Sequence, residues 1–198
     1  MRDGGFAIYE GIADDRIRKL LLAEALTSAR QATEGFVPTS DREEVRGGTP
    51  ARRFLNASGG PVQEAFYKAP WLLSLLRDIT SPSLVPTGPL GTYSYYARAG
   101  DYLAIHRDIV SCDVAVITCL SDASEAHASG GMLCLYPERL LEPLSAIRAT
   151  PESGARKLRL KPGQTIVMYG GIIPHALLPV SRGQARIVSV LCYRLLST

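Results

Sequence analysis

Two of the chain's three histidines stand where they could bind a metal ion together with one aspartate. His106 and Asp108 are separated by a single residue, and His175 follows 69 residues after His106. Two histidines and one carboxylate form the facial triad that binds Fe(II) on one side and leaves the other coordination positions open. Because reactants bind at those open positions, the sequence predicts a catalytic metal site made of His106, Asp108 and His175.

One arginine beyond this set needs a negatively charged partner. Arg186 follows His175 by eleven residues and begins an apolar run. In a strand its own face would carry Val188, Val190 and Cys192, so we expect its side chain to be buried. A buried guanidinium is costly unless an anion meets it, so either a protein carboxylate or a ligand carboxylate must be present. A dianionic co-substrate such as 2-oxoglutarate would offer a suitable group.

The spacing of the predicted ligands favours a strand. Residues two apart in a strand project to the same face, whereas on a helix they lie about 200° apart. Apolar, partly β-branched residues flank both ligand segments, as is typical of buried strands. A lone His-x-Asp pair often arises by chance at a surface turn, but the pair followed by a distant histidine and an arginine is far more specific. His127 lies among small residues at 125–131 and is interpreted as solvent-exposed.

The second half of the chain is predicted to supply the strands that position these residues. From Gly91 onward, short β-type runs alternate with turn signals. Eight such strands make a jelly-roll barrel, the double-stranded β-helix. Segments 161–164 and 181–184 are predicted to form tight turns. The predicted strands cover residues 92–98, 102–108, 113–121, 131–136, 158–161, 164–169, 172–178 and 185–194.

The first ninety residues are predicted to be mainly helical. After a short strand at 6–9, Asp14 or Asp15 can cap an amphipathic helix, and a second helical region begins near Pro61 and restarts at Pro70. The apolar stripes of these helices are expected to pack outside the β-structure. Residues 35–60 mix arginines and glutamates with Gly, Pro and Ser, which fits either a lid over the barrel or a solvated connection.

From about residue 91 to residue 193, the chain resembles the Fe(II)/2-oxoglutarate-dependent dioxygenases, and more narrowly their prolyl-hydroxylase-like branch. The resemblance implies Fe(II), with 2-oxoglutarate and O2 as co-substrates. It implies that His106, Asp108 and His175 bind the iron and that Arg186 binds the distal carboxylate of 2-oxoglutarate. The stretches that carry it are residues 93–96, 101–108, 130–137 and 174–186.

The resemblance also implies finer features of the site. Tyr96 takes the position of an active-site tyrosine near the co-substrate. Where relatives place a second tyrosine, this chain has Cys119 beside Thr118, which is a departure from the pattern. Related halogenases replace the metal-binding carboxylate with a small residue to admit chloride, and Asp108 closes that position. Hydroxylation, or an oxidative variant such as desaturation, is therefore the expected reaction.

The predicted function is hydroxylation of an unactivated C–H bond of a small molecule, with release of succinate and CO2. A free amino acid or small metabolite is favoured because the chain is short, and a peptidyl or carrier-bound substrate stays open. Arg98, Tyr102 and part of segment 35–60 are the predicted substrate contacts. Two alternatives are a non-catalytic metal- or ligand-binding jelly roll and a cupin-like oxygenase that does not use 2-oxoglutarate. The intact triad argues against the first, and Arg186 argues against the second.

Composition agrees with one α+β, mainly β domain over residues 1–198, with helical support at 1–90 and a jelly-roll core at 91–198. The 198 residues are 46% hydrophobic and 21% charged, with a net charge of +3, which does not favour nucleic acid. No apolar run has the length of a signal peptide or membrane span, so no membrane partner and a cytoplasmic location are expected. The four cysteines form no C-x-x-C pair and are predicted to be reduced core residues.

Overall fold

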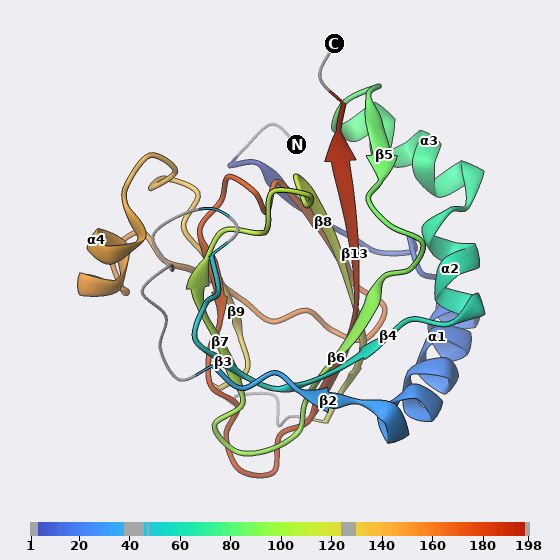
Figure 1. The fold of residues 1–198 in the computed structure, drawn as a ribbon, viewed down its shortest axis with the longest axis horizontal. Coiled ribbons are helices and arrows are strands. Elements are labelled where there is room, and N and C mark those ends of the chain that lie inside the picture. Colours follow the sequence, from blue (N-terminus) through green and yellow to red (C-terminus); the bar gives the residue numbers. More distant parts are fainter. Residues whose placement is uncertain (1–3, 38–45, 47, 124–129, 197–198) are drawn as a thin grey trace.

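Two antiparallel sheets face each other and enclose a barrel in the computed structural model, which describes residues 4–37, 46, 48–123 and 130–196 (Figure 1). This confirms the mainly β jelly roll predicted from the sequence. In order, the larger sheet contains β1 (Phe6–Tyr9), β11 (Thr165–Met168), β8 (Val114–Asp122), β13 (Arg186–Leu195), β6 (Thr92–Tyr96), β4 (Leu55–Ser58) and β2 (Thr33–Glu34), and β5 (Leu84–Pro86) pairs with β13. The smaller sheet contains β10 (Arg156–Leu158), β9 (Leu133–Leu135), β12 (His175–Leu177), β7 (Tyr102–His106) and β3 (Arg52–Arg53).

The eight strands predicted after residue 91 are all present, with shifted or shortened ends. The largest shortening is at β12, which begins only at His175 because Gly170, Gly171 and Pro174 interrupt the pattern that precedes it. Both predicted turns form, since the N–H of Gln164 donates to the carbonyl of Lys161 and that of Gln184 donates to Ser181. β-branched residues fill the centre of the larger sheet, where β8 and β13 pair along most of their length.

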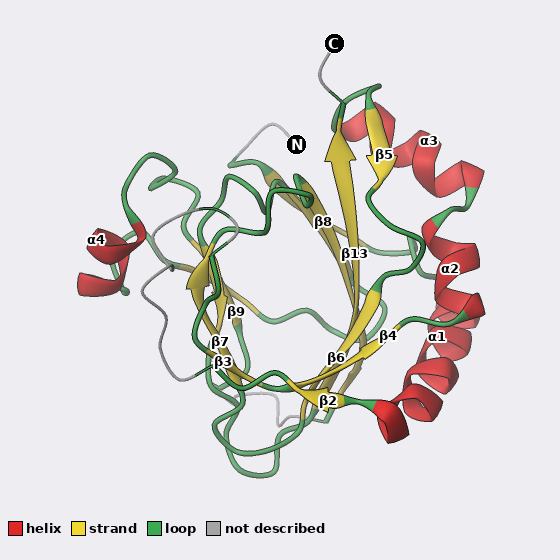
Figure 2. Cartoon of the chain, in the orientation of Figure 1, coloured by secondary structure: helices red, strands yellow, loops and turns green. Residues whose placement is uncertain are grey.

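Helices α1 (Asp15–Ser28), α2 (Pro61–Tyr67) and α3 (Pro70–Ile79) lie together beside the larger sheet, and α4 (Leu144–Ala149) lies on the opposite side of the barrel (Figure 2). A short 3-10 turn, η1 (Ala29–Gln31), continues α1. The Asp14 side chain caps α1 by accepting from the N–H of Ile17 at 2.7 Å, as predicted. No helix in the described parts of the chain is long and apolar enough to cross a membrane.

One carboxylate joins α1 to the start of α2. Glu24 accepts hydrogen bonds from the backbone N–H groups of Gly60, Val62 and Gln63 at 3.2, 2.7 and 2.9 Å. It also accepts from the Tyr93 hydroxyl at 2.7 Å. Because the first N–H groups of a helix have no partner within the helix, Glu24 supplies the cap that the local sequence of α2 lacks.

Part of segment 35–60 belongs to the walls of the barrel. Strand β3 pairs with β7, and β4 pairs with β6. The expectation of a lid or a solvated connection is therefore wrong for residues 52–58, which complete both sheets. Residues 38–45 and 47 lie outside the described residues, as does His127.

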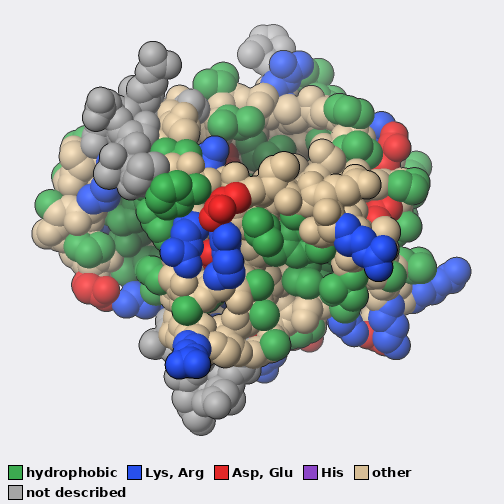
Figure 3. Space-filling view, turned by 60° about the horizontal axis from the view of Figure 1, so that its bottom comes forward, with side chains coloured by type: hydrophobic (Ala, Val, Ile, Leu, Met, Phe, Trp, Pro, Cys, Tyr) green, Lys and Arg blue, Asp and Glu red, His purple; other side chains and the backbone are tan. Residues whose placement is uncertain are grey.

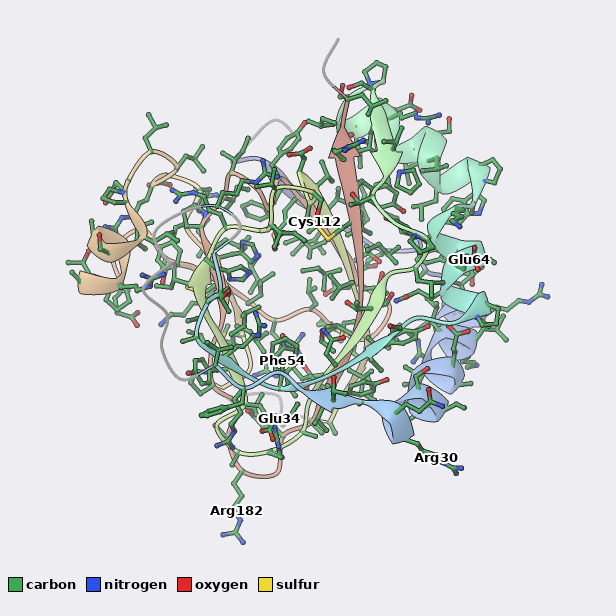
Figure 4. The ribbon with its side chains drawn as sticks, in the orientation of Figure 1. Arg30, Glu34, Phe54, Glu64, Cys112 and Arg182 are labelled. Carbon is green, nitrogen blue, oxygen red and sulfur yellow. A yellow bond between two sulfur atoms is a disulfide. The ribbon has the colours of Figure 1, made fainter. Side chains whose placement is uncertain are left out.

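The prediction that all four cysteines are reduced is wrong for two of them. Cys112 and Cys192 form a disulfide across 80 residues of sequence, with their Cα atoms 5.0 Å apart. The pairing of β8 with β13 explains this, because Tyr193 stands opposite Val114 and brings the neighbouring cysteines together. Figure 4 labels Cys112 at this link. Cys119 and Cys134 are free and buried, as expected.

Candidate metal centre

Two adjacent strands of the smaller sheet bring the two histidines together. His106 is the last residue of β7, His175 is the first residue of β12, and the two are opposite each other in the antiparallel ladder. Both side chains are buried. Asp108 lies two residues beyond β7, where its N–H donates to the carbonyl of Gly170 at 2.9 Å. The three residues predicted from sequence therefore meet at one point.

Their ligand atoms face one another. Oδ1 of Asp108 lies 3.5 Å from Nε2 of His106 and 3.6 Å from Nε2 of His175. The two imidazole centroids are 4.2 Å apart. One ligand atom from each residue lies within 4.8 Å of the others, which fits a shared metal ion.

Backbone carbonyls orient both imidazoles. Nδ1 of His106 lies 2.9 Å from the carbonyl of Ala104, and Nδ1 of His175 lies 2.9 Å from that of Ile173. A carbonyl only accepts hydrogen bonds, so each Nδ1 is the donor, and in the neutral ring the lone pair is on Nε2. Both histidines thus present a metal-binding nitrogen toward Asp108.

The electrostatics of the triad favour a cation. Burial and the neighbouring His175 lower the pKa of His106. For His175, burial acts in the same direction, but the Asp108 carboxylate outweighs it and raises the pKa. Burial would raise the pKa of Asp108, yet the two imidazoles hold it well below its usual range. Oδ1 of Asp108 faces both imidazoles, and among the described residues its Oδ2 is buried without a hydrogen-bond partner, so the carboxylate is free to bind a divalent cation beside the two Nε2 atoms.

Two glycines leave room for the Asp108 carboxylate and for an arginine that binds the Asp108 backbone. A Cβ at Gly170 would lie 1.9 Å from Oδ2 of Asp108, and one at Gly171 would lie 2.5 Å from the guanidinium of Arg46. That guanidinium donates to the carbonyl of Asp108 at 3.2 Å and pairs with Asp113 at 2.6 Å. Sequence reasoning missed these supports, although a Gly-Gly pair shortly before a predicted ligand was a usable signal.

Arg186 lies at the start of β13 with only 2% of its side chain exposed. Its guanidinium donates to the carbonyl of Gly131 and, at 3.4 Å, to that of Leu160. A protein carboxylate is also near, since Oδ2 of Asp122 lies 3.6 Å from Nε. Asp122 makes a closer contact with Arg159, at 3.0 Å, so it neutralises the charge of Arg186 only in part. Nε of Arg186 is buried and has no hydrogen-bond partner in the described part of the chain.

The triad and Arg186 line one cavity of about 200 Å³ between the two sheets. Tyr96 lines it too, opposite Arg186 in the β6–β13 ladder. Burial raises the pKa of Tyr96, although the charge of Arg186 opposes this, so the hydroxyl stays protonated and can donate a hydrogen bond. The other lining residues are Phe54, Asn56, Thr92, Ser94, Leu103, Ala115, Ile117, Leu133, Leu160, Ala176, Leu177, Val188 and Val190.

The remaining predicted residues lie outside the cavity lining. The sulfur of Cys119 is buried and lies 4.0 Å from Nη2 of Arg186. Arg98 pairs with Glu34 at 2.9 Å and with Asp101 at 3.2 Å. Tyr102 lies in a separate surface depression. Substrate contact by Arg98 and Tyr102 stays a prediction that the shape of the cavity does not favour.

No family model and no curated protein matches the sequence. Solved structures do match the fold. The Pseudomonas putida prolyl-4-hydroxylase is 16% identical, with a TM-score of 0.65, covering 98% of this chain and 94% of that one. The epimerase SnoN, in complex with Fe3+, alpha ketoglutarate and nogalamycin RO, is 15% identical, with a TM-score of 0.70 and coverage of 96% and 78%. HygX from Streptomyces hygroscopicus, with nickel and 2-oxoglutarate bound, is 13% identical, with a TM-score of 0.66 and coverage of 96% and 82%. At these identities the likeness shows the fold.

Proposed function

We propose that this protein is an Fe(II)- and 2-oxoglutarate-dependent oxygenase that hydroxylates a C–H bond of a small molecule. One observation carries the proposal. A single cavity holds two histidine Nε2 atoms and a carboxylate in one place and a buried, incompletely paired guanidinium in another. The first set fits a divalent metal, and the second fits a carboxylate.

His106, Asp108 and His175 would hold the iron. Two imidazole nitrogens and one carboxylate, with no fourth protein ligand among the described residues, are the donor set of the non-haem Fe(II) oxygenases. When bound, Fe(II) supplies the redox chemistry that activates O2. The protein's own contribution is to fix both imidazoles through Ala104 and Ile173 and to keep the site away from bulk water.

Arg186 and Tyr96 would bind the co-substrate. The guanidinium, which Asp122 pairs only in part, would bind the distal carboxylate of 2-oxoglutarate, while it also donates to the carbonyls of Gly131 and Leu160. The protonated hydroxyl of Tyr96 lies on the same face and can donate a second hydrogen bond. The descriptions of SnoN and HygX as complexes with this keto acid support the assignment. Oxidative decarboxylation would release succinate and CO2.

The experiment that tests this proposal is succinate formation. Protein loaded anaerobically with Fe(II) is given 2-oxoglutarate and then O2, with and without a panel of small metabolites. We expect succinate to form, and one compound to stimulate it. If iron loading is verified and no succinate forms under any condition, binding of 2-oxoglutarate to the loaded protein decides the outcome. No binding would refute the proposed function, and binding without turnover would indicate a non-catalytic ligand-binding protein.

A further inference from the structure

A row of neutral polar side chains extends along the cavity wall that belongs to the larger sheet. Thr92 and Ser94 alternate along β6 on the face that lines the cavity, and Asn56 of β4 is the ladder partner of Ser94. Ser94 is only 5% exposed. Within the described residues, none of these three side chains has a hydrogen-bond partner. Ser94 is buried and the other two are half-buried, so their polar atoms can pair with water or with a ligand in the cavity.

This row leads to a second hollow. It measures about 560 Å³ and shares Phe54, Asn56 and Thr92 with the cavity that the triad lines. Figure 4 labels Phe54 and Glu34 at this edge of the barrel. A molecule in the hollow would therefore border the cavity that holds the triad. The remaining lining residues of the hollow are Thr33, Glu34, Gly35, Arg52, Ala57 and Ser58.

Neighbouring arginines in β3 point in opposite directions. Arg52 stands opposite Leu103 in the ladder with β7, and Leu103 lines the cavity, so the side chain of Arg52 lies on the cavity face. Arg53 stands opposite Tyr102 on the other face, where it contacts Asp101 at 3.2 Å and the carbonyl of Ala99 at 2.6 Å. Arg52 has no acidic partner among the described residues.

The acids near Arg52 are engaged elsewhere. Glu34 lies in the hollow, but it pairs with Arg98 at 2.9 Å. Asp101 pairs with both Arg53 and Arg98. Acidic and basic side chains also lie side by side on the face that Figure 3 shows. In the described part of the chain, three guanidinium groups thus face two carboxylates, and Arg52 is the arginine that no acidic side chain pairs with.

We propose that this hollow binds the substrate of the proposed oxygenase, and that Arg52 binds an anionic group of that substrate, a carboxylate or a phosphate monoester. The neutral part of the substrate extends past Asn56 and Ser94 toward the metal site. Hydroxyl or carbonyl groups of the substrate would form hydrogen bonds with these two side chains. This inference rests on the proposed function. It also narrows the substrate class, because no described lining residue offers a free carboxylate for the ammonium group of a free amino acid.

The test uses three probes that share one carbon chain: hexanoate, hexyl phosphate and 1-hexanol. The protein is loaded with Mn(II) and saturated with 2-oxoglutarate, so that Arg186 is occupied. Mn(II)-induced broadening of the probe's proton signals then reports binding near the metal without any turnover. We expect both anions to bind roughly five- to tenfold more tightly than the alcohol at low salt. The anion that binds more tightly indicates whether the anionic group of the substrate is a carboxylate or a phosphate monoester.

Variants decide whether Arg52 causes the preference. Arg52→Gln should reduce it to near unity, and Arg52→Lys, which keeps the charge, should retain part of it. Arg182→Gln is the matched control, because Arg182 is an exposed turn residue that points away from the barrel (Figure 4). Equal binding of anions and alcohol, or a preference that survives in Arg52→Gln, would overturn the inference.

Failure of the proposed function would be visible separately. In that case Mn(II) or 2-oxoglutarate would not bind to the unaltered protein at all. The three probes would then be compared on metal-free protein by saturation transfer, where the Arg52-dependent preference for anions is either present or absent. The substrate hollow and the oxygenase assignment can therefore fail independently of each other.

Discussion

The two walls of the barrel contribute differently to the site. The smaller sheet has short strands, and its ligands lie at strand ends, with His106 closing β7, His175 opening β12 and Asp108 beyond the sheet. The larger sheet contributes Arg186, the first residue of β13, and Tyr96, the last residue of β6, and these two residues pair with each other inside the sheet, whereas Asp108 has left the smaller sheet. A triad needs a chain that turns so that a carboxylate can face two imidazoles, whereas an anion site needs a rigid, buried wall. The metal ligands therefore come from the smaller sheet and the loop after it, and the anion-binding residues come from the larger sheet.

The strongest test of this division is His175→Ala. It removes one of the three ligands on the smaller sheet, and we expect the metal affinity to fall by more than about 100-fold, because losing even a residue that only orients a ligand costs roughly 10–100-fold. Isothermal titration with Mn(II) measures this. Retained metal affinity in a folded His175→Ala protein would show that the metal is held elsewhere.

The disulfide should matter for the stability of the larger sheet and little for the metal. Replacing both Cys112 and Cys192 with serine removes a cross-link over 80 residues, and we expect the free energy of unfolding to fall by about 2–4 kcal/mol. Urea denaturation measures the loss, and wild-type protein treated with a reductant is the control. Alkylation of four thiols in denatured, unreduced wild-type protein would contradict the disulfide itself.

Arg186→Ala should weaken binding of the co-substrate and leave binding of the metal in place. Loss of a charge-assisted contact of about 2–3 kcal/mol weakens 2-oxoglutarate binding roughly 30- to 150-fold. The Mn(II) affinity should stay nearly unchanged because Arg186 does not touch the triad. The 2-oxoglutarate affinity of Arg186→Lys should lie between those of wild-type protein and Arg186→Ala, since lysine keeps the charge but lacks the planar guanidinium. Unaltered co-substrate affinity in Arg186→Ala would make this arginine a structural partner of Asp122.

The smallest effect is expected at Glu24, outside both walls. Burial would raise its pKa, but hydrogen bonds from Tyr93 and from the N–H groups that begin α2 lower it below the ordinary 4.5. A lowered folded-state pKa contributes stability above pH 4.5, and this contribution is lost as the pH falls through the folded-state value. Glu24→Gln should therefore cost about 1 kcal/mol at neutral pH, and less in acid.

Thermal unfolding of Glu24→Gln and wild-type protein between neutral and acidic pH measures this difference. The metal affinity serves as its control and should not change. A stability difference that grew on acidification would mean that Glu24 does not carry its charge in the fold.

The sequence predicted what depends on local patterns. His106, Asp108 and His175 stand out because polar ligands interrupt apolar strands, and Arg186 stands out because a cation begins an apolar row. The jelly roll followed from the spacing of turns and short β-type runs. The strand and turn signals lie within a few residues of the features that they predict, whereas the metal site was predicted from the order of the His-x-Asp pair, the later histidine and the arginine along the chain.

What the sequence missed depends on contacts between distant segments. A two-residue strand such as Arg52–Arg53 carries no alternation, and β3 forms through its pairing with β7 and the bridge of Arg52 to Val37. The Cys112–Cys192 link follows from the register of β8 against β13. The partial contact between Asp122 and Arg186 likewise needs the fold, since neither residue marks the other in the sequence.

The backbone at Gly170 and Gly171 bears on how such sites can be recognised in other chains. At both positions the space of an absent side chain is filled from elsewhere, by the Asp108 carboxylate and the Arg46 guanidinium. Any larger residue at 170 would compete with a metal ligand for the same volume. A chain with His-x-Asp and a later histidine but no glycine at this place would have to hold its carboxylate differently, so a glycine at the place of Gly170 is a residue to look for beside the triad pattern.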